Sequence, residues 1–145
     1  PRFVLSPRGA AKAAQLAGEF PEGVRVAASN QEVVDSADCV LVAVLPQGAE
    51  EALGALVFRP GQQVISFVST LKLARLRELI APAAECAMAM PLPAVAKRQG
   101  ATILVPPLPV AKAIFSALGS CVAVQDEPQF RRMQCVTALT GAAAA

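Results

Sequence analysis

The chain has 145 residues, 54% of them hydrophobic, and a formal net charge of +2. This length is enough for one domain with a sizeable core. No run of lysine and arginine exceeds two residues, so the clustered basic surface of a nucleic-acid-binding protein is not expected. No apolar run approaches the roughly 18 residues of a membrane helix. We therefore expect neither nucleic acid nor a membrane as a partner.

The four cysteines are far apart in the sequence, at Cys39, Cys86, Cys121 and Cys135. Their spacing matches neither a zinc-ligand pair nor a redox Cys-x-x-Cys motif. Three lie in apolar runs, so we interpret them as buried, reduced thiols, which are typical of a cytoplasmic protein. The chain has no histidine, which removes the commonest acid–base residue and metal ligand. No metal site is predicted.

Hydrophobic patterns and turn residues predict strands that alternate with helices along most of the chain. We expect strands at residues 2–6, 24–27, 39–45, 63–68, 86–90, 101–105 and 121–125. We expect helices at residues 10–17, 30–35, 48–56, 71–80 and 110–118, and a last helix from about Pro128 with an exposed apolar face that includes Phe130 and Met133.

The stretch Cys39–Gln47 is the most apolar strand, and Pro46 stops it because proline has no N–H for a ladder. It does not alternate polar with apolar residues, a pattern typical of a central strand buried on both faces of a parallel sheet. Ligands of open α/β sheets bind just beyond the carboxyl ends of strands. The backbone of residues 43–47 is therefore a candidate ligand edge.

This order of elements predicts an α/β fold, a doubly wound parallel sheet of the Rossmann-like kind over residues 1–125. The alternation stops near Asp126, where the last helix is either a covering helix or the start of a helical domain. The chain lacks the G-x-G-x-x-G loop that binds a pyrophosphate after the first strand of such a sheet. It begins on what reads as the second strand, and the missing first strand would leave a gap. We interpret the sequence as a fragment; the alternative is a fold that binds no dinucleotide.

Four stretches, in order, carry a resemblance to a known family. They are Ser6-Pro7-Arg8, Asn30-Gln31-Glu32-Val33-Val34 with Ala37-Asp38, Ala43-Val44-Leu45-Pro46-Gln47, and Thr137-Ala138-Leu139-Thr140-Gly141. The chain resembles the pyrroline-5-carboxylate reductase family, whose members have an N-terminal NADP-binding domain and a C-terminal helical dimerisation domain. The resemblance implies NADPH-dependent reduction of a cyclic imine, 1-pyrroline-5-carboxylate, to proline. It also implies that residues 126–145 begin the dimerisation domain and that the protein is a homodimer or a higher homo-oligomer.

The resemblance also implies a set of site residues. The cofactor side consists of Ser6 and Arg8 at the adenosine ribose and its 2′-phosphate, Asn30 near the adenosine, Ala43, Val44, Leu45 and Pro46 through backbone and small side chains, and Phe67, Val68 and Ser69 beside the nicotinamide. The substrate side consists of Thr137 and Thr140. Simpler roles stay open, because Asn30 and Ser69 are natural helix caps, Arg8 can be solvated, and a helical threonine can bond its own backbone. No catalytic residue is assigned.

The expected cofactor is NADP(H) rather than NAD(H). NAD enzymes usually place an acidic residue near this strand end, where it holds the ribose 2′-hydroxyl. The turn at residues 6–9 has no acidic residue, and Arg8 supplies a permanent positive charge. A guanidinium attracts the 2′-phosphate that a carboxylate would repel.

Two alternatives follow from departures from the family pattern. The family's lysine is Leu45 here, and its Arg-x-Met-Pro-Asn-x-Pro segment becomes Met88-Ala89-Met90-Pro91-Leu92-Pro93. These changes favour a related imine or oxo acid reductase with another substrate. The missing glycine-rich loop allows a non-catalytic Rossmann-like scaffold used for dimerisation.

Overall fold

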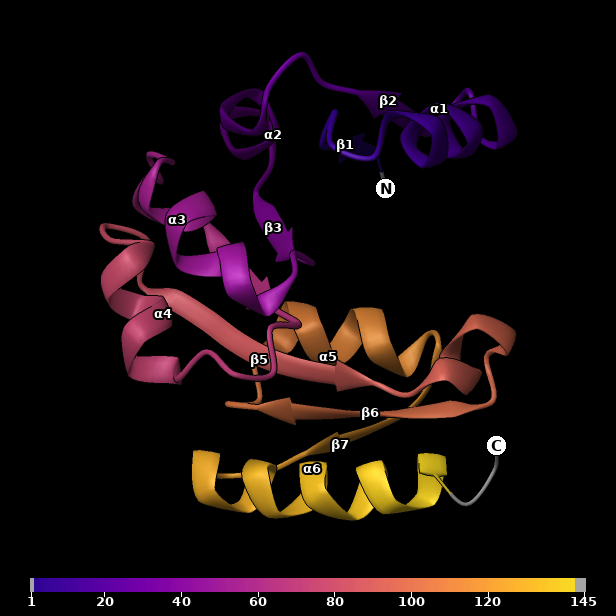
Figure 1. Ribbon diagram of the computed structural model, residues 1–145, viewed down its shortest axis with the longest axis vertical. Helices are drawn as coiled ribbons and strands as arrows, with labels where there is room; N and C mark the ends of the chain where they lie inside the picture. Colours follow the sequence, from indigo (N-terminus) through magenta and orange to yellow (C-terminus); the bar gives the residue numbers. More distant parts are fainter. Residues whose placement is uncertain (1, 143–145) are drawn as a thin grey trace.

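The computed structural model describes the backbone of residues 2–142 and the side chains of residues 2–135. Its strands are β1 (Phe3–Leu5), β2 (Val24–Val26), β3 (Cys39–Val42), β4 (Gln63–Ser66), β5 (Glu85–Pro91), β6 (Gly100–Val105) and β7 (Gly119–Ala123). Its α-helices are α1 (Ala10–Glu19), α2 (Asn30–Ser36), α3 (Ala49–Gly54), α4 (Leu73–Leu79), α5 (Pro109–Ser116) and α6 (Glu127–Ala142), with short 3-10 helices η1 (Pro46–Gly48) and η2 (Pro93–Lys97). The α/β, Rossmann-like class predicted from the sequence is confirmed (Figure 1).

Local sequence signals explain several helix starts. Gly9 precedes α1 with φ of 70°, a left-handed conformation that glycine adopts without steric cost. Ser29 caps α2, because its Oγ accepts a hydrogen bond from the Glu32 N–H at 3.1 Å. Pro109 occupies the first turn of α5, where its missing N–H has no intrahelical partner to lose.

The strands form a two-stranded parallel sheet, β1-β2, and a five-stranded sheet of order β3-β4-β5-β6-β7. In the larger sheet β3, β4 and β5 run parallel, and so do β6 and β7. The register places Val42 beside Ser66, so β3 and β4 end side by side at their carboxyl ends. This edge is the one on which the candidate site depends.

The expectation of an entirely parallel sheet is wrong at one pair, since β5 and β6 are antiparallel. A parallel connection needs a crossover of about a dozen or more residues, usually a helix. Only residues 92–99, with the short helix η2, join these two strands. The sequence carried this signal in its spacing, because only residues 91–100 separate the two expected strands, fewer than a parallel crossover needs.

Helices cover both faces of the larger sheet. On one face, α3 and α4 pack over β3 and β4 around Val64 and Leu76, while α6 packs over β5 and β6 through Phe130. On the other face, α5 packs against Ile65 and Leu104. Figure 1 shows α5 and α6 on opposite sides of the sheet. Alternate residues of β4 thus enter different cores, which is the doubly wound arrangement.

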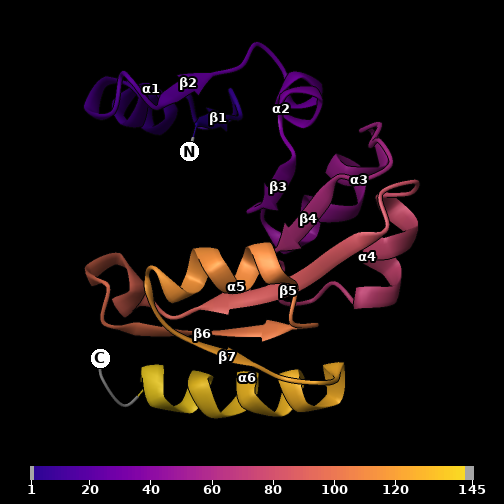
Figure 2. The same ribbon diagram turned by 180° about the vertical axis from the view of Figure 1, so that it is seen from behind.

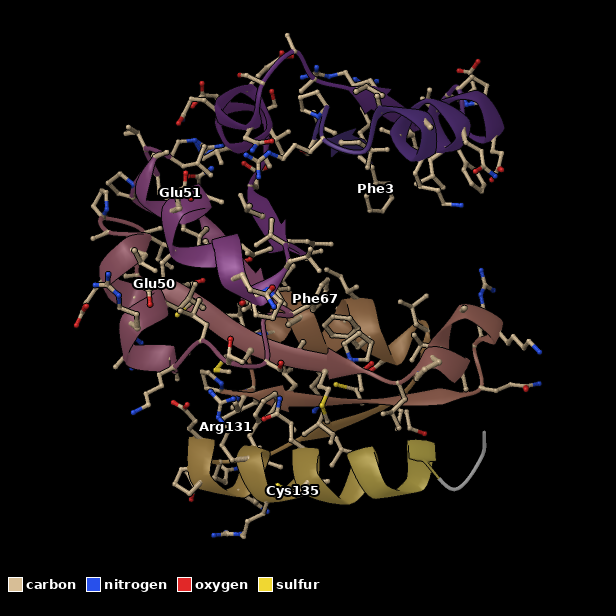
Figure 3. The ribbon with its side chains drawn as sticks, in the orientation of Figure 1. Phe3, Glu50, Glu51, Phe67, Arg131 and Cys135 are labelled. Carbon is tan, nitrogen blue, oxygen red and sulfur yellow. The ribbon has the colours of Figure 1, made fainter. Side chains whose placement is uncertain are left out.

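β3 is an edge strand of its sheet rather than the central strand that its composition predicted. Val40 and Val42 are buried, but Leu41 is 41% exposed. No ladder joins β3 to β1 among the described residues, and both views show the β1–β2 pair apart from β3 (Figures 1 and 2). The gap expected between these strands is therefore present. Figure 3 shows the Phe3 ring pointing from β1 into this space, and Phe3 is 50% exposed.

The start of α6 is part of the sheet's core. Phe130 is only 1% exposed and packs with Met88, Ile103 and Val105, and Met133 packs against the same cluster. The exposed apolar face expected at these two residues is therefore wrong, because β5 and β6 cover them. The domain boundary at residue 126 stays a prediction. No helix within residues 2–142 is long and apolar enough to span a membrane.

We predict that Val42→Asp abolishes cooperative folding. Val42 lies in the main core at 5% exposure, and an unpaired buried carboxylate costs several kcal/mol of a total stability of roughly 5–15 kcal/mol. The matched control is Leu41→Asp on the same strand, which should lower stability far less. The measurement is urea unfolding followed by circular dichroism, and equal midpoints for Val42→Asp and the wild type would show that β3 is misassigned.

Candidate cofactor site

The structure brings together Ser6 and Asn30, which are 24 positions apart in the sequence. The Ser6 Oγ donates a hydrogen bond to the Asn30 Oδ1 at 2.6 Å, joining the end of β1 to the first residue of α2. Asn30 is not the cap of α2, since Ser29 has that role. Its side chain therefore faces the β1 turn, as a residue near a nucleotide at this strand end would.

The turn after β1 presents Arg8 to solvent. The Ser6 Oγ accepts a hydrogen bond from the Arg8 backbone N–H at 3.1 Å, which fixes the turn, and Gly9 follows in its left-handed conformation. Arg8 is exposed, and no salt bridge among the described residues engages it. A guanidinium, a hydroxyl and an amide thus lie around one strand end that has no carboxylate in its turn.

Glu32 holds the loop that carries Asn30. Its Oε2 accepts from the Ala28 N–H at 2.7 Å, and its Oε1 accepts from the Arg25 guanidinium at 2.5 Å. The backbone hydrogen bond from Ala28 and then the Arg25 side chain lower the pKa of Glu32 below its usual value of 4.5. These contacts stabilise the ionised carboxylate and fix the start of α2.

The end of β3 is open to solvent. Ala43, Leu45 and Pro46 are exposed and Val44 is half-buried against the core. Leu45, which stands where the family has lysine, is 78% exposed, and Pro46 begins η1. The predicted backbone edge at residues 43–46 is thus accessible.

The end of β4 lies beside it, since the Phe67 N–H donates to the Val42 carbonyl at 2.9 Å. Phe67 packs edge-on against Phe115 of α5, with ring centroids 6.0 Å apart (Figure 3). Val68 is buried and Ser69 is exposed. Neither Ser69 nor Thr70 caps α4, because the helix begins at Leu73 after Lys72 with no side-chain cap of its own. Helix capping, the simpler role considered for Ser69, is therefore excluded.

Two residues that the sequence did not single out organise this loop, namely Glu127 and Arg131 of α6. The Glu127 Oε2 accepts from the Leu73 N–H at 3.1 Å, and the Arg131 Nη2 donates to the Leu71 carbonyl at 2.7 Å. Their spacing of four residues is visible in the sequence as a helical ion pair. Their reach to a loop more than fifty positions away is not.

The remaining predictions have different outcomes. Thr137 and Thr140 lie on α6, but their side chains are outside the described residues, so their substrate role stays a prediction. All four cysteines are free, and burial raises the pKa of Cys39, Cys86 and Cys121. Of the three cysteines in apolar runs, which were expected to be buried, Cys86 is buried and Cys39 and Cys121 are half-buried; Cys135 is exposed. Among the described residues no cluster of three or more acidic, cysteine or histidine side chains could hold a metal ion.

Comparison with known proteins gives consistent matches. Residues 2–70 match the family described as NADP oxidoreductase, coenzyme F420-dependent. The chain is 31% identical over 145 residues to the pyrroline-5-carboxylate reductase of Pseudomonas aeruginosa, covering 94% of this chain and 51% of that protein. The chain therefore spans about half the length of this curated relative.

Solved structures agree on the fold. The 1-pyrroline-5-carboxylate reductase of Streptococcus pyogenes superposes with a TM-score of 0.72 at 21% identity, over 86% of this chain and 49% of that one. A reductive aminase of Aspergillus terreus, solved with NADPH4, cyclohexanone and allyl amine, also gives 0.72, at 17% identity over 92% of this chain and 50% of that one.

The architecture is Rossmann-like, and residues 2–70 match a class described as NADP oxidoreductases. Within that class, the resemblance to the pyrroline-5-carboxylate reductase family is confirmed.

We predict that Glu32 makes folding stability depend on pH. Because its pKa is lowered in the folded state, its contribution is complete above its unfolded pKa and is lost as the pH falls through the folded value. Glu32→Gln should therefore melt below the wild type at neutral pH and approach it as the solution is acidified. The measurement is the melting temperature across the acidic range. Glu22→Gln, an exposed carboxylate removed elsewhere, is the control, and a Glu32→Gln difference that stays constant with pH would contradict the assignment.

Proposed function

We propose that the protein is an NADPH-dependent reductase of a cyclic imine, resembling pyrroline-5-carboxylate reductase, and that it converts 1-pyrroline-5-carboxylate to proline. The observation that carries this proposal is the 31% identity to such a reductase over 94% of the chain. The family match over residues 2–70 supports it, since this region contains the three strand ends of the candidate cofactor site.

The residues around β1 fit the adenosine end of NADP(H). The Ser6 hydroxyl and the Asn30 amide, held together at 2.6 Å, offer neutral hydrogen-bonding groups for a ribose. Arg8 offers the planar donors that suit the 2′-phosphate, and no carboxylate lies in residues 6–9 to repel it. This donor set favours NADP(H) over NAD(H).

The ends of β3 and β4 would hold the nicotinamide half. Bound NADPH would supply the hydride. Residues 43–46 offer an exposed backbone, and Phe67 and Ser69 form the neighbouring wall on either side of Val68, which is buried in the core; the β3–β4 ladder aligns the two strand ends. The chain's task is to orient the ring and exclude water, because an already protonated C=N needs no strong acid from the protein. This requirement suits a chain without histidine.

A different imine or oxo acid is the second candidate substrate. The exposed Leu45 in place of lysine, and the loss of the family's arginine and asparagine near Met90, favour it. The full-length protein should be assayed for NADPH oxidation with 1-pyrroline-5-carboxylate and with a panel of cyclic imines and oxo acids. Preference for 1-pyrroline-5-carboxylate supports the main proposal, and preference for another substrate supports the second. A protein that binds no NADPH would instead favour the non-catalytic scaffold.

The proposed assembly is a homodimer or a higher homo-oligomer formed through the C-terminal helices, in the cytoplasm. The family relationship and the match of Thr137–Gly141 to the start of its dimerisation domain support this assembly. Three half-buried or buried thiols with raised pKa values support a reducing compartment.

We predict that Arg8→Ala in the full-length protein erases most of the preference for NADPH over NADH. A charge-assisted hydrogen bond contributes roughly 1.5–3 kcal/mol, or about ten- to a hundredfold in affinity. NADPH binding should weaken by that factor, while NADH binding, which lacks the 2′-phosphate, should barely change. The measurement is a pair of dissociation constants from cofactor fluorescence. Lys97→Ala, the loss of an exposed charge elsewhere, is the control. Equal losses for both cofactors would show that Arg8 is structural, and no loss would show that it is only solvated.

A further inference from the structure

The loop between β4 and α4, residues 67–72, is held by a helix from the other end of the chain. Helix α4 has no side-chain cap within its own segment. Glu127, the first residue of α6, supplies the acceptor instead, and its Oε2 lies 3.1 Å from the Leu73 N–H. A carboxylate is the favoured acceptor at a helix N-terminus. The start of α4 is therefore fixed only while α6 is in place.

Arg131 holds the rest of the same loop. Its Nη1 donates to the Ser69 carbonyl and its Nη2 to the Leu71 carbonyl, the latter at 2.7 Å. Its Nε and Nη2 also donate to the Glu127 Oε1, at 3.2 and 2.8 Å. One planar guanidinium thus joins two loop carbonyls and the capping carboxylate, a geometry that the single ammonium of lysine cannot reproduce.

This clamp, defined as Glu127 and Arg131, is sheltered and anchored. The two side chains are only 25% and 31% exposed. Between them in the sequence, Phe130 is buried against β5 and β6, so α6 is fixed to the sheet at this turn. Figure 3 shows Arg131 on the side of α6 that faces the sheet. The loop backbone at Ser69 is therefore tied to a rigid part of the core.

We propose that Arg131, together with Glu127, is a positioning residue for the nicotinamide half of the cofactor. It acts through the backbone of residues 69–71, which follows the predicted nicotinamide wall at Phe67–Ser69, and it touches no part of the cofactor itself. This assignment rests on the proposed function. It predicts that loss of the clamp weakens contacts at the nicotinamide end and leaves those at the adenosine end unchanged, because Ser6 and Arg8 lie in the turn after β1, in the other sheet, and Asn30 is the first residue of α2.

The test compares two ligands on the same variants of the full-length protein. NADPH reaches both ends of the site, whereas 2′,5′-ADP carries only the adenosine end. Arg131→Gln should weaken NADPH binding by about tenfold, as expected for lost charge-assisted contacts, and leave 2′,5′-ADP binding within about twofold. Arg131→Lys should also weaken NADPH binding and leave 2′,5′-ADP binding unchanged, but the loss of NADPH affinity should be smaller. Arg132→Gln removes a neighbouring exposed arginine from the same helix and should change neither.

Hydrogen exchange without any ligand tests the clamp itself. Amides of residues 71–73 should exchange faster in Arg131→Gln and at the wild-type rate in Arg132→Gln. Unchanged exchange in Arg131→Gln overturns the proposal, as does equal weakening of both ligands or of neither. If Arg131→Gln does not fold, the same comparison of NADPH and 2′,5′-ADP affinities in Arg131→Lys decides whether the proposal holds. A full-length wild-type protein that binds neither ligand overturns the proposed function and this assignment with it, while altered exchange would still reveal the clamp.

Discussion

The parallel ladder between β3 and β4 is the constraint on which the rest of the structure depends. It pairs Val42 with Ser66 and continues into the loop through the hydrogen bond from the Phe67 N–H to the Val42 carbonyl. One face of this ladder is covered by the core around Val42 and Val64, which fixes its register. On the other face, Ile65 of β4 is buried while Leu41 of β3 is 41% exposed. Because parallel strands end at the same edge, two loops of different sequence origin are presented side by side, and this is the place where open α/β sheets bind ligands.

The sequence predicted most of the fold because local signals and the global architecture agree. Ser29 and Glu32 mark the start of α2, Pro109 marks α5, and the apolar run from Cys39 marks β3. The errors concern relations between distant segments. The direction of β6 relative to β5 depends on the length of the connection between them rather than on the composition of either strand. The burial of Phe130 depends on which surface α6 covers. The spacing of apolar residues shows which face of a helix is apolar, but not which strands that face packs against.

The candidate site was predictable to the extent that strand ends are predictable. The hydrogen bond between Ser6 and Asn30 shows that the two side chains meet at one strand end, while their role toward a cofactor stays a prediction. Ser69 shows where local sequence fails to predict a contact. The residues just before α4 suggested a cap at Ser69, but the cap comes from Glu127, 54 positions beyond Leu73. Nothing in the short segment before α4 reveals that partner. Long-range polar contacts of this kind follow from packing, because the side chains of α6 reach the loop only if the helix lies against the sheet.

In the proposed cofactor site, two separate sheets contribute to the binding of one NADPH. Amide hydrogen exchange of the full-length protein, with and without NADPH, reports on both sheets in one experiment. We expect NADPH to protect three strand ends at once: residues 6–9 after β1, residues 43–47 after β3 and residues 67–70 after β4. The start of α2 at Asn30 should be protected with them. NADH should protect the last two strand ends but protect residues 6–9 less. Protection confined to one sheet, or spread over α5 and β7 instead, would show that the two sheets do not share one cofactor site.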